Sequence, residues 1–295
     1  MSHLRATKPI KYTETLAYIT AYPIRDEWRH VGIFMKHFEG ASQRAAALGY
    51  KLEEFWLREP GLTAARASRI LCARGIRGLI IAPLPHARGH LSLDWKHFAT
   101  ASIGYTLWQP NLHRAVEHQS HAIILAMRQL KRLGYRRIGL AVPAQYDRRV
   151  DHNWLAGYDV YQYNLPPQDR VPALVTDDWN QITFLRWFRK YRPDVIIGLN
   201  LILIKWLRHA GKFTPEHVGF VNVDSLASPG AAAIDRNGDL VGAAAVDLVV
   251  EQLHHNELGI PATPKTVMVE TRWVDGNTIR NRRAVVKRGK PFRKS

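Results

Sequence analysis

Short apolar runs alternate with amphipathic segments along most of this 295-residue chain, and no other feature limits its fold as narrowly. Such runs lie at residues 16–20, 51–57 and 78–85 in the first half and at 137–143, 172–176, 195–200 and 218–224 in the second. Short, fully apolar strands between helices are typical of parallel sheets covered on both faces. Two series predict an α/β protein with two lobes. Because ligands of open α/β sheets lie at the carboxyl ends of the strands, we expect a ligand cleft between the lobes.

The amphipathic segments are predicted to be helices. From Val31 to Leu48 apolar residues recur at steps of three and four, and Gly49 is placed to end that helix. Either Asp177 or Asp178 is expected to cap a later helix, since a carboxylate oxygen accepts hydrogen bonds from first-turn N–H groups. Further helices are predicted from about Thr63 and at residues 123–133, 153–163, 178–190, 202–210 and 239–255.

Composition and length are those of a folded protein with room for two ordinary domains: 46% of the residues are hydrophobic and 23% are charged. No apolar run approaches the roughly 18 residues that span a membrane. The first residues lack the apolar core of a secretory signal, and Cys72 is the single cysteine, so we expect a cytoplasmic protein. Cys72 lies on a predicted helix, where we expect a buried, unreactive thiol.

The formal net charge is +17, and basic residues concentrate at positions 131–132, 136–137 and 287–295. Such a charge attracts nucleic acid, either directly or through a neighbouring DNA-binding part. The alternative is a solvated basic surface, which the scattered positions of most arginines and lysines favour.

The common signatures of catalysis are missing from the sequence. There is no glycine-rich dinucleotide or phosphate loop, no nucleophile elbow and no His-Glu-x-x-His helix. The pairs His254–His255 and His86–His90 lack the carboxylate or cysteine partners of a recognisable zinc site, so we interpret them as solvated. The sequence therefore predicts neither an enzyme nor a metal or cofactor site.

Two loops that follow apolar runs mix aromatic and charged side chains. In the loop at residues 22–28 an aromatic ring is placed to stack on a ligand while Arg25 and Asp26 bond its hydroxyl groups. An ordinary loop with a half-buried Trp28 is the alternative. In the loop at residues 145–154, His152 and Trp154 begin a helix and are expected to face the cleft. The alternative for this tryptophan is packing in the core against Tyr158.

Polar residues also follow the ends of three apolar strands in the second half. Side chains at strand ends indicate a binding site more readily than polar residues on helix surfaces. One of residues 235–237 is also placed to cap the last helix. The complete set of predicted ligand-binding residues is Tyr22, Arg25, Asp26, Trp28, Tyr105, His152, Trp154, Asn200, Asn222, Asp224, Asp235 and Arg236.

Taken together, these segments resemble the sensor domain of the LacI/GalR family of bacterial transcription regulators, whose fold is shared with periplasmic sugar-binding proteins. The resemblance extends from about residue 14 to residue 281. The most specific segment is Leu-Gly-Tyr-Arg-Arg-Ile-Gly-Leu at residues 133–140, and weaker ones are at residues 78–83, 218–224 and 233–246.

This resemblance implies two Rossmann-like lobes of the type I periplasmic binding protein kind, joined by three chain crossings. We expect an N-terminal lobe of residues 14–112 and 237–260 and a C-terminal lobe of residues 113–236 and 261–283. Residues 1–13 look like the end of a hinge that follows an absent helix-turn-helix headpiece. The basic segment at residues 284–295 is expected to be a disordered tail.

The resemblance further implies a sugar or similar small polar metabolite as effector. By position, Asn200 matches the family's cleft asparagine, the pair at 221–222 matches its cleft aspartates, and Arg236 lies at or beside another polar contact. Trp154 stands where many members have a sugar-binding arginine, with His152 nearby. Here Trp154, Val221 and Arg236 depart from the family pattern.

The implied mechanism is a shift of population, in which the ligand closes the cleft and changes the affinity for operator DNA. We expect a homodimer built from helices of the first lobe and the small-residue helix around residues 242–253. The alternatives are a solute-binding protein that serves a sugar transporter and an enzyme on a doubly wound fold, for which the sequence offers no acid, base or nucleophile constellation.

Overall fold

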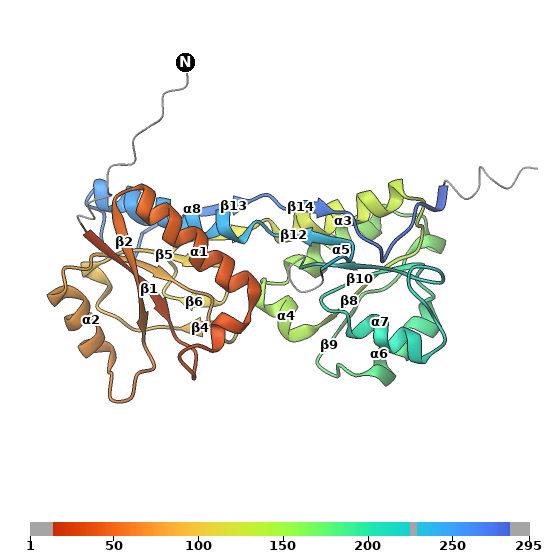
Figure 1. The fold of residues 1–295 in the computed structure, drawn as a ribbon, viewed down its shortest axis with the longest axis horizontal. Helices are drawn as coiled ribbons and strands as arrows, with labels where there is room; N and C mark the ends of the chain where they lie inside the picture. The colour runs from red at the N-terminus through yellow and green to blue at the C-terminus, as the bar shows by residue number, and fades with distance from the viewer. Residues whose placement is uncertain (1–13, 225–228, 284–295) are drawn as a thin grey trace, which may run out of the picture. The chain divides into compact units, whose positions relative to one another are not determined.

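The chain folds into two compact units, each formed from segments that are distant in sequence (Figure 1). The computed structural model describes residues 14–224 and 229–283. Unit 1 comprises the chain up to Glu117 together with Asn237–Val269. Unit 2 comprises His118–Arg236 together with the chain from Glu270 onward. The chain therefore crosses between units three times, as the resemblance implies. The predicted hinge at residues 1–13 and tail at 284–295 lie outside the described residues.

Two of the three expected lobe boundaries are displaced. The sequence-based boundaries after residues 112 and 260 assign β7 (His113–Glu117) and β13 (Thr266–Val269) to the C-terminal lobe. That assignment is wrong, because β7 pairs with β5 (Ala99–Ile103) and β13 pairs with β7 in the sheet of unit 1. Hydrogen bonding to a neighbouring strand, which has no local sequence signal, decides where these segments belong.

Unit 1 is built on a parallel six-stranded sheet with the order β13-β7-β5-β3-β1-β2. Its other strands are β1 (Glu14–Thr20), β2 (Tyr50–Trp56) and β3 (Gly78–Ile81). A separate small sheet pairs β4 (Gly89–His90) with β6 (Leu107–Gln109). The helical segments are η1 (Glu27–His30), α1 (Gly32–Ala47), α2 (Ala64–Ala73), η2 (Trp95–His97) and α8 (Gly238–His254).

The two faces of this sheet bury different sets of side chains, as the period-two geometry of a strand requires. Along β1, Tyr18 belongs to a core cluster with residues of α1 and α8, whereas Ile19 belongs to a second cluster with Leu71 of α2. Both residues are fully buried. This explains why the inner part of β1 and the whole of β3 are apolar without alternation.

Helices α1 and α8 approach each other closely through glycines. A Cβ atom added at Gly242 would lie 1.9 Å from the backbone oxygen of His37, and one at Gly40 would lie 1.9 Å from that of Asp239. Neither distance is possible for a real Cβ, so both positions require glycine. The small-residue face of α8 is thus filled by α1 of the same chain.

Unit 2 carries a second six-stranded sheet with the order β14-β12-β11-β10-β8-β9, in which only β14 is antiparallel to its neighbour. Its strands are β8 (Ile138–Pro143), β9 (Leu174–Thr176), β10 (Val195–Gly198), β11 (Gly219–Asn222), β12 (Ala233–Asp235) and β14 (Arg272–Val274). Its helices are α3 (Gln119–Arg132), α4 (Ala144–Arg149), α5 (Asn153–Tyr163), η3 (Pro167–Asp169), α6 (Gln181–Tyr191) and α7 (Ile202–His209).

Two buried clusters flank this sheet as well. One joins residues of α3 and α5 to the strands, among them Met127 and Tyr158, and the other joins residues of α6 and α7, among them Phe184 and Leu207. One fully parallel sheet and a second that is parallel except for β14, each covered by helices, confirm the predicted α/β class.

Local details of two helices differ from the prediction. Asn180, rather than Asp177 or Asp178, caps α6: its Oδ1 accepts a hydrogen bond from the backbone N–H of Thr183 at 2.9 Å. The expectation that Cys72 is buried is wrong, because α2 turns Ala67 and Leu71 toward the core and leaves this thiol exposed. Within residues 14–224 and 229–283, no helix is both long and apolar enough to cross a membrane.

Candidate functional site

Polar side chains gather where the parallel strands of unit 2 end. Strands β9, β8, β10, β11 and β12 run in the same direction, so their carboxyl ends share one edge of the sheet. This is the edge at which open α/β sheets bind ligands. The polar residues that follow these strands are Asp147 and Arg148 after β8, Asp177 after β9, Asn200 after β10, Asn222 and Asp224 at the end of β11, and Asp235 and Arg236 at the end of β12.

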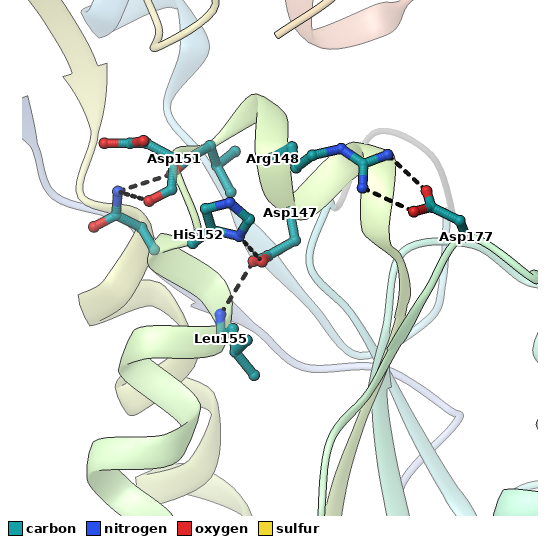
Figure 2. A network of polar contacts seen from close by, with 8 residues as sticks. Asp147, Arg148, Asp151, His152, Leu155 and Asp177 are labelled. Carbon is teal, nitrogen blue, oxygen red and sulfur yellow. Dashed lines mark hydrogen bonds and ion pairs between the residues drawn. The ribbon is translucent and has the colours of Figure 1, made fainter. Parts of the chain in front are cut away.

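Asp147 organises the first part of this edge (Figure 2). Its fully buried carboxylate accepts a hydrogen bond from the backbone N–H of Leu155 at 3.1 Å and lies 2.8 Å from Nδ1 of His152. His152 has a left-handed backbone, with φ of 59°, and begins α5. The carboxylate therefore fixes both the first turn of α5 and the orientation of an imidazole that remains half exposed.

Arg148 points away from this pair, toward Asp177 (Figure 2). Its two terminal nitrogens donate to the two carboxylate oxygens of Asp177 at 3.1 and 2.6 Å, a bidentate arrangement. The hydrogen bond from Arg148 lowers the pKa of Asp177 below its ordinary value. This ion pair connects the segment after β8 to the segment after β9, both on the surface.

The two asparagines use their side chains to shape the backbone. Oδ1 of Asn200 accepts a hydrogen bond from the N–H of Ile202 at 2.5 Å, at the start of α7. Oδ1 of Asn222 accepts one from the N–H of Asp224 at 3.0 Å. Asn222 is fully buried, whereas Asn200 is exposed. Of the two, Asn200 is thus the one open to a solute.

Two ion pairs complete the edge. Asp224 lies 3.5 Å from a terminal nitrogen of Arg236, and both side chains are only 12% exposed. Asp235 pairs with Arg272 at 2.5 Å, which links β12 to β14. A carboxylate and a guanidinium held together with so little exposure present paired acceptors and donors in a fixed geometry.

The predicted site residues of unit 1 differ in burial, and two of them, Tyr22 and Trp28, lie in the core. Trp28 is buried against Tyr18 and Phe38, and its Nε1 donates to Glu54 at 3.1 Å. Tyr22 is also buried. Both expectations for Trp28, a ring that stacks on a ligand and a half-buried ring in an ordinary loop, are therefore wrong, because this ring is folded into the core.

The three remaining candidates of unit 1 are at its surface. Asp26 pairs with Arg29 at 3.0 Å, and Arg25 is exposed in the same loop. Tyr105 is half-buried under the guanidinium of Arg114, which lies 5.4 Å from the ring centre.

Trp154 belongs to the core of unit 2. Its side chain is 3% exposed, it packs in the cluster that contains Tyr158, and its Nε1 donates to Oε1 of Gln119 at 2.7 Å. The second of the two sequence-based interpretations, a position in the core, therefore holds, with Tyr158 in the same cluster. In contrast, His152, two residues earlier in the sequence, has a side chain that is 54% exposed.

Several polar residues at strand ends were missed in the sequence. Asp147, Arg148 and Asp177 lack a motif, and their pairing depends on two segments that meet only in the folded sheet. Unit 1 also has a cavity of about 220 Å³ at the carboxyl ends of β1 and β2. Its polar lining residues are Arg58, Thr63, His90 and Ser92.

The comparisons with known proteins agree with this architecture. Residues 127–279, just over half of the chain, match the family described as periplasmic binding protein-like domain. A search of curated proteins finds no match.

Solved structures of LacI-family regulators share the fold. A dimeric Lac repressor with a C-terminal deletion has a TM-score of 0.62 and 17% identity, covering 90% of this chain and 99% of that chain. A LacI family transcriptional regulator from Enterococcus faecium, solved with bound ribose, has a TM-score of 0.58 and 14% identity, covering 90% and 99%. The complex of the transcriptional regulator CelR with cellobiose has a TM-score of 0.64 and 16% identity, covering 92% and 86%.

These likenesses extend over nearly the whole chain and include both units. They show that the chain has the fold of the sensor domains of LacI-family regulators. Together with the match over residues 127–279, they establish that the chain belongs to the family of periplasmic binding protein-like domains.

Proposed function

We propose that this chain is the effector-binding domain of a LacI-type transcriptional regulator in the cytoplasm, and that its effector is a sugar or a similar small polar metabolite. The observation that carries the proposal is the row of carboxylate, amide and guanidinium groups at the carboxyl edge of the unit 2 sheet. The fold supports the proposed role in a regulator, because the solved structures with this fold are regulators of this kind.

The chemistry of this edge suits a polyhydroxylated ligand. Hydroxyl groups donate to carboxylate and amide oxygens and accept from guanidinium and amide N–H groups. Asp224, Arg236 and Asn200 supply such groups from three neighbouring strand ends, and His152 adds an imidazole oriented by Asp147. Two structural neighbours are solved with ribose and with cellobiose. The sequence-based expectation that the ligand lies between the lobes stays a prediction.

In this proposal the effector acts by shifting a conformational equilibrium. A ligand that binds one conformation more tightly raises the population of that conformation, and the coupling changes the affinity for operator DNA. In this proposal the effector-binding domain itself does not contact the operator, and its conformation sets the affinity of the regulator for DNA.

The test is a thermal-shift screen with ribose, glucose, cellobiose and other sugars, followed by calorimetric titration of the sugar that stabilises the protein. A ligand present at about 100 times its Kd stabilises the native state by about 2.7 kcal/mol, which is a readily measured shift. Absence of a shift with every sugar at millimolar concentration would contradict the proposed effector class.

Replacing Asn200 or Asp224 with alanine is expected to weaken binding of that sugar about tenfold or more, because each loses a polar group from the strand-end site. The melting temperature without sugar should stay near that of the parent for Asn200→Ala, since Asn200 is exposed. Asn164→Ala is the matched control. Asn164 is an exposed asparagine that follows the C-terminal end of α5, whereas His152 precedes the N-terminal end. Its Nδ2 donates a hydrogen bond to the backbone oxygen of Val160, and its replacement should leave the affinity for the sugar unchanged.

The proposal includes a homodimer, formed through helices of unit 1. Because α1 fills the glycine face of α8, we expect the opposite, exposed side of α8 to take part, where Leu240 is 53% exposed. Sedimentation equilibrium should show a dimer at micromolar concentration and a larger monomer fraction for Leu240→Asp. A parent protein that is monomeric throughout would exclude this interface.

A further inference from the structure

A group of two histidines and one glutamate forms where two neighbouring strands end. Strands β7 and β13 are parallel neighbours, and their register places Val269 opposite Glu117. The next residue on each strand is therefore part of the same group: His118 after β7 and Glu270 after β13. His121 follows three positions later in the first turn of α3, on the same face of the helix as His118.

The side chains converge on one another. Nδ1 of His118 lies 2.8 Å from Oε1 of Glu270, and Nδ1 of His121 lies 2.6 Å from Oε2. The two imidazole rings are 5.1 Å apart between centres. One donor atom from each of the three residues lies within 4.8 Å of the other two. These distances bring three ligand atoms close enough to share one ion.

We propose that His118, His121 and Glu270 bind a divalent transition-metal ion and that Zn²⁺ is the preferred ion. Two imidazole nitrogens and one carboxylate oxygen are a ligand set that Zn²⁺ accepts, with a solvent molecule in the fourth position. Imidazole ligands also suit Ni²⁺ and Cu²⁺, whereas Mg²⁺ and Ca²⁺ prefer oxygen ligands alone. The side chains are 32%, 36% and 64% exposed, so an ion reaches them from solvent.

The competing explanation is a carboxylate that simply hydrogen-bonds two histidines. Such contacts are common at surfaces, and the chain holds a simpler example in His97, whose Nε2 lies 3.2 Å from Asp94. That pair has one imidazole and one carboxylate, whereas the group at Glu270 has two imidazoles. This difference makes His97 a suitable control. Removing its imidazole should not change metal affinity, because among the residues that the structure describes only the group at Glu270 brings three ligand side chains together.

Binding of an ion would cross-link two segments of unit 2 that are far apart in sequence. His118 and His121 begin α3, and Glu270 precedes β14, so one ion would hold the start of a helix to the segment after β13. A ligand that binds only the native arrangement stabilises it. We therefore expect metal to raise the melting temperature of the protein.

The experiment is calorimetric titration of the metal-free protein with Zn²⁺, with Co²⁺ absorption as a second readout of coordination. The parent is expected to bind one ion per chain at this site, and the variants His121→Ala and Glu270→Gln are each expected to bind it at least about tenfold more weakly. His97→Ala is expected to bind like the parent. Mg²⁺ should produce no comparable heat or stabilisation.

The outcomes separate the two explanations. Equal Zn²⁺ affinity in the parent, His121→Ala and Glu270→Gln would overturn the proposal and leave hydrogen bonding as the role of the group. Melting curves recorded without metal show whether a variant remains folded, and Glu270→Gln keeps the shape of the side chain. Because the readouts are metal affinity and Co²⁺ spectrum, the result does not depend on finding the sugar effector.

Discussion

Replacing Trp154 with alanine is expected to lower the free energy of unfolding by about 3–5 kcal/mol, the cost typical of truncating a large buried aromatic side chain. The ring is 3% exposed and packs in the core cluster of unit 2. The change also removes the hydrogen bond from Nε1 to Gln119. Urea unfolding followed by circular dichroism measures this difference.

The control lies on the same helix. Tyr163, at the end of α5, is 78% exposed, and Tyr163→Ala should cost no more than about 1 kcal/mol. Trp154→Phe keeps most of the packing, so it should retain a folded protein and normal affinity for the sugar effector. If Trp154→Ala were as stable as the parent, or if Trp154→Phe abolished sugar binding, the assignment of this residue to the core would be wrong.

Gly242→Ala is expected to destabilise the protein by about 3 kcal/mol through a clash between helices. The added Cβ would lie 1.9 Å from the oxygen of His37 and 2.8 Å from the nitrogen of Ala41, both backbone atoms of α1. The intrinsic preference of a helix acts in the opposite direction, since alanine is favoured over glycine by about 1 kcal/mol. A loss of stability therefore shows that the packing of α8 on α1 outweighs helix propensity.

Gly32→Ala provides the comparison for that experiment. Gly32 is the first residue of α1 and is exposed, so the same addition of a methyl group should be neutral or slightly stabilising. Urea midpoints of the two variants against the parent test the argument. A Gly242→Ala protein as stable as the parent would mean that the two helices separate without cost.

Local patterns in the sequence predict the helices well. Helix α5 has the expected bounds, α1 ends two residues before Gly49, and Thr63 caps α2 by accepting a hydrogen bond from the N–H of Arg66. Each of these features depends on residues within a turn or two of one another, which is why the sequence reveals them. The cap of α6 was misplaced by two residues or more because Asp177, Asp178 and Asn180 are all good capping residues.

The strands that were missed are those without a continuous apolar run. β5 reads Ala-Thr-Ala-Ser-Ile and β7 reads His-Arg-Ala-Val-Glu, yet most of their residues are buried. Small and polar residues are accommodated there because the neighbouring strands and α8 supply hydrogen-bond partners. Gln252 of α8, for example, accepts a hydrogen bond from the backbone N–H of Thr100 and donates one to its backbone oxygen. No local pattern predicts such a contact between residues so far apart.

For the site, the sequence alone determined which residues follow the apolar strands, and the parallel order of those strands is enough to place Asn200, Asp224 and Arg236 at one edge. Only the tertiary structure decided that Trp28 and Trp154 lie in cores, that Asp147 orients His152, and that His118, His121 and Glu270 meet. The physical reason is the range of the interactions. Strand and helix patterns arise from neighbouring residues, whereas burial of a ring and pairing of charges depend on segments that only the complete fold brings into contact.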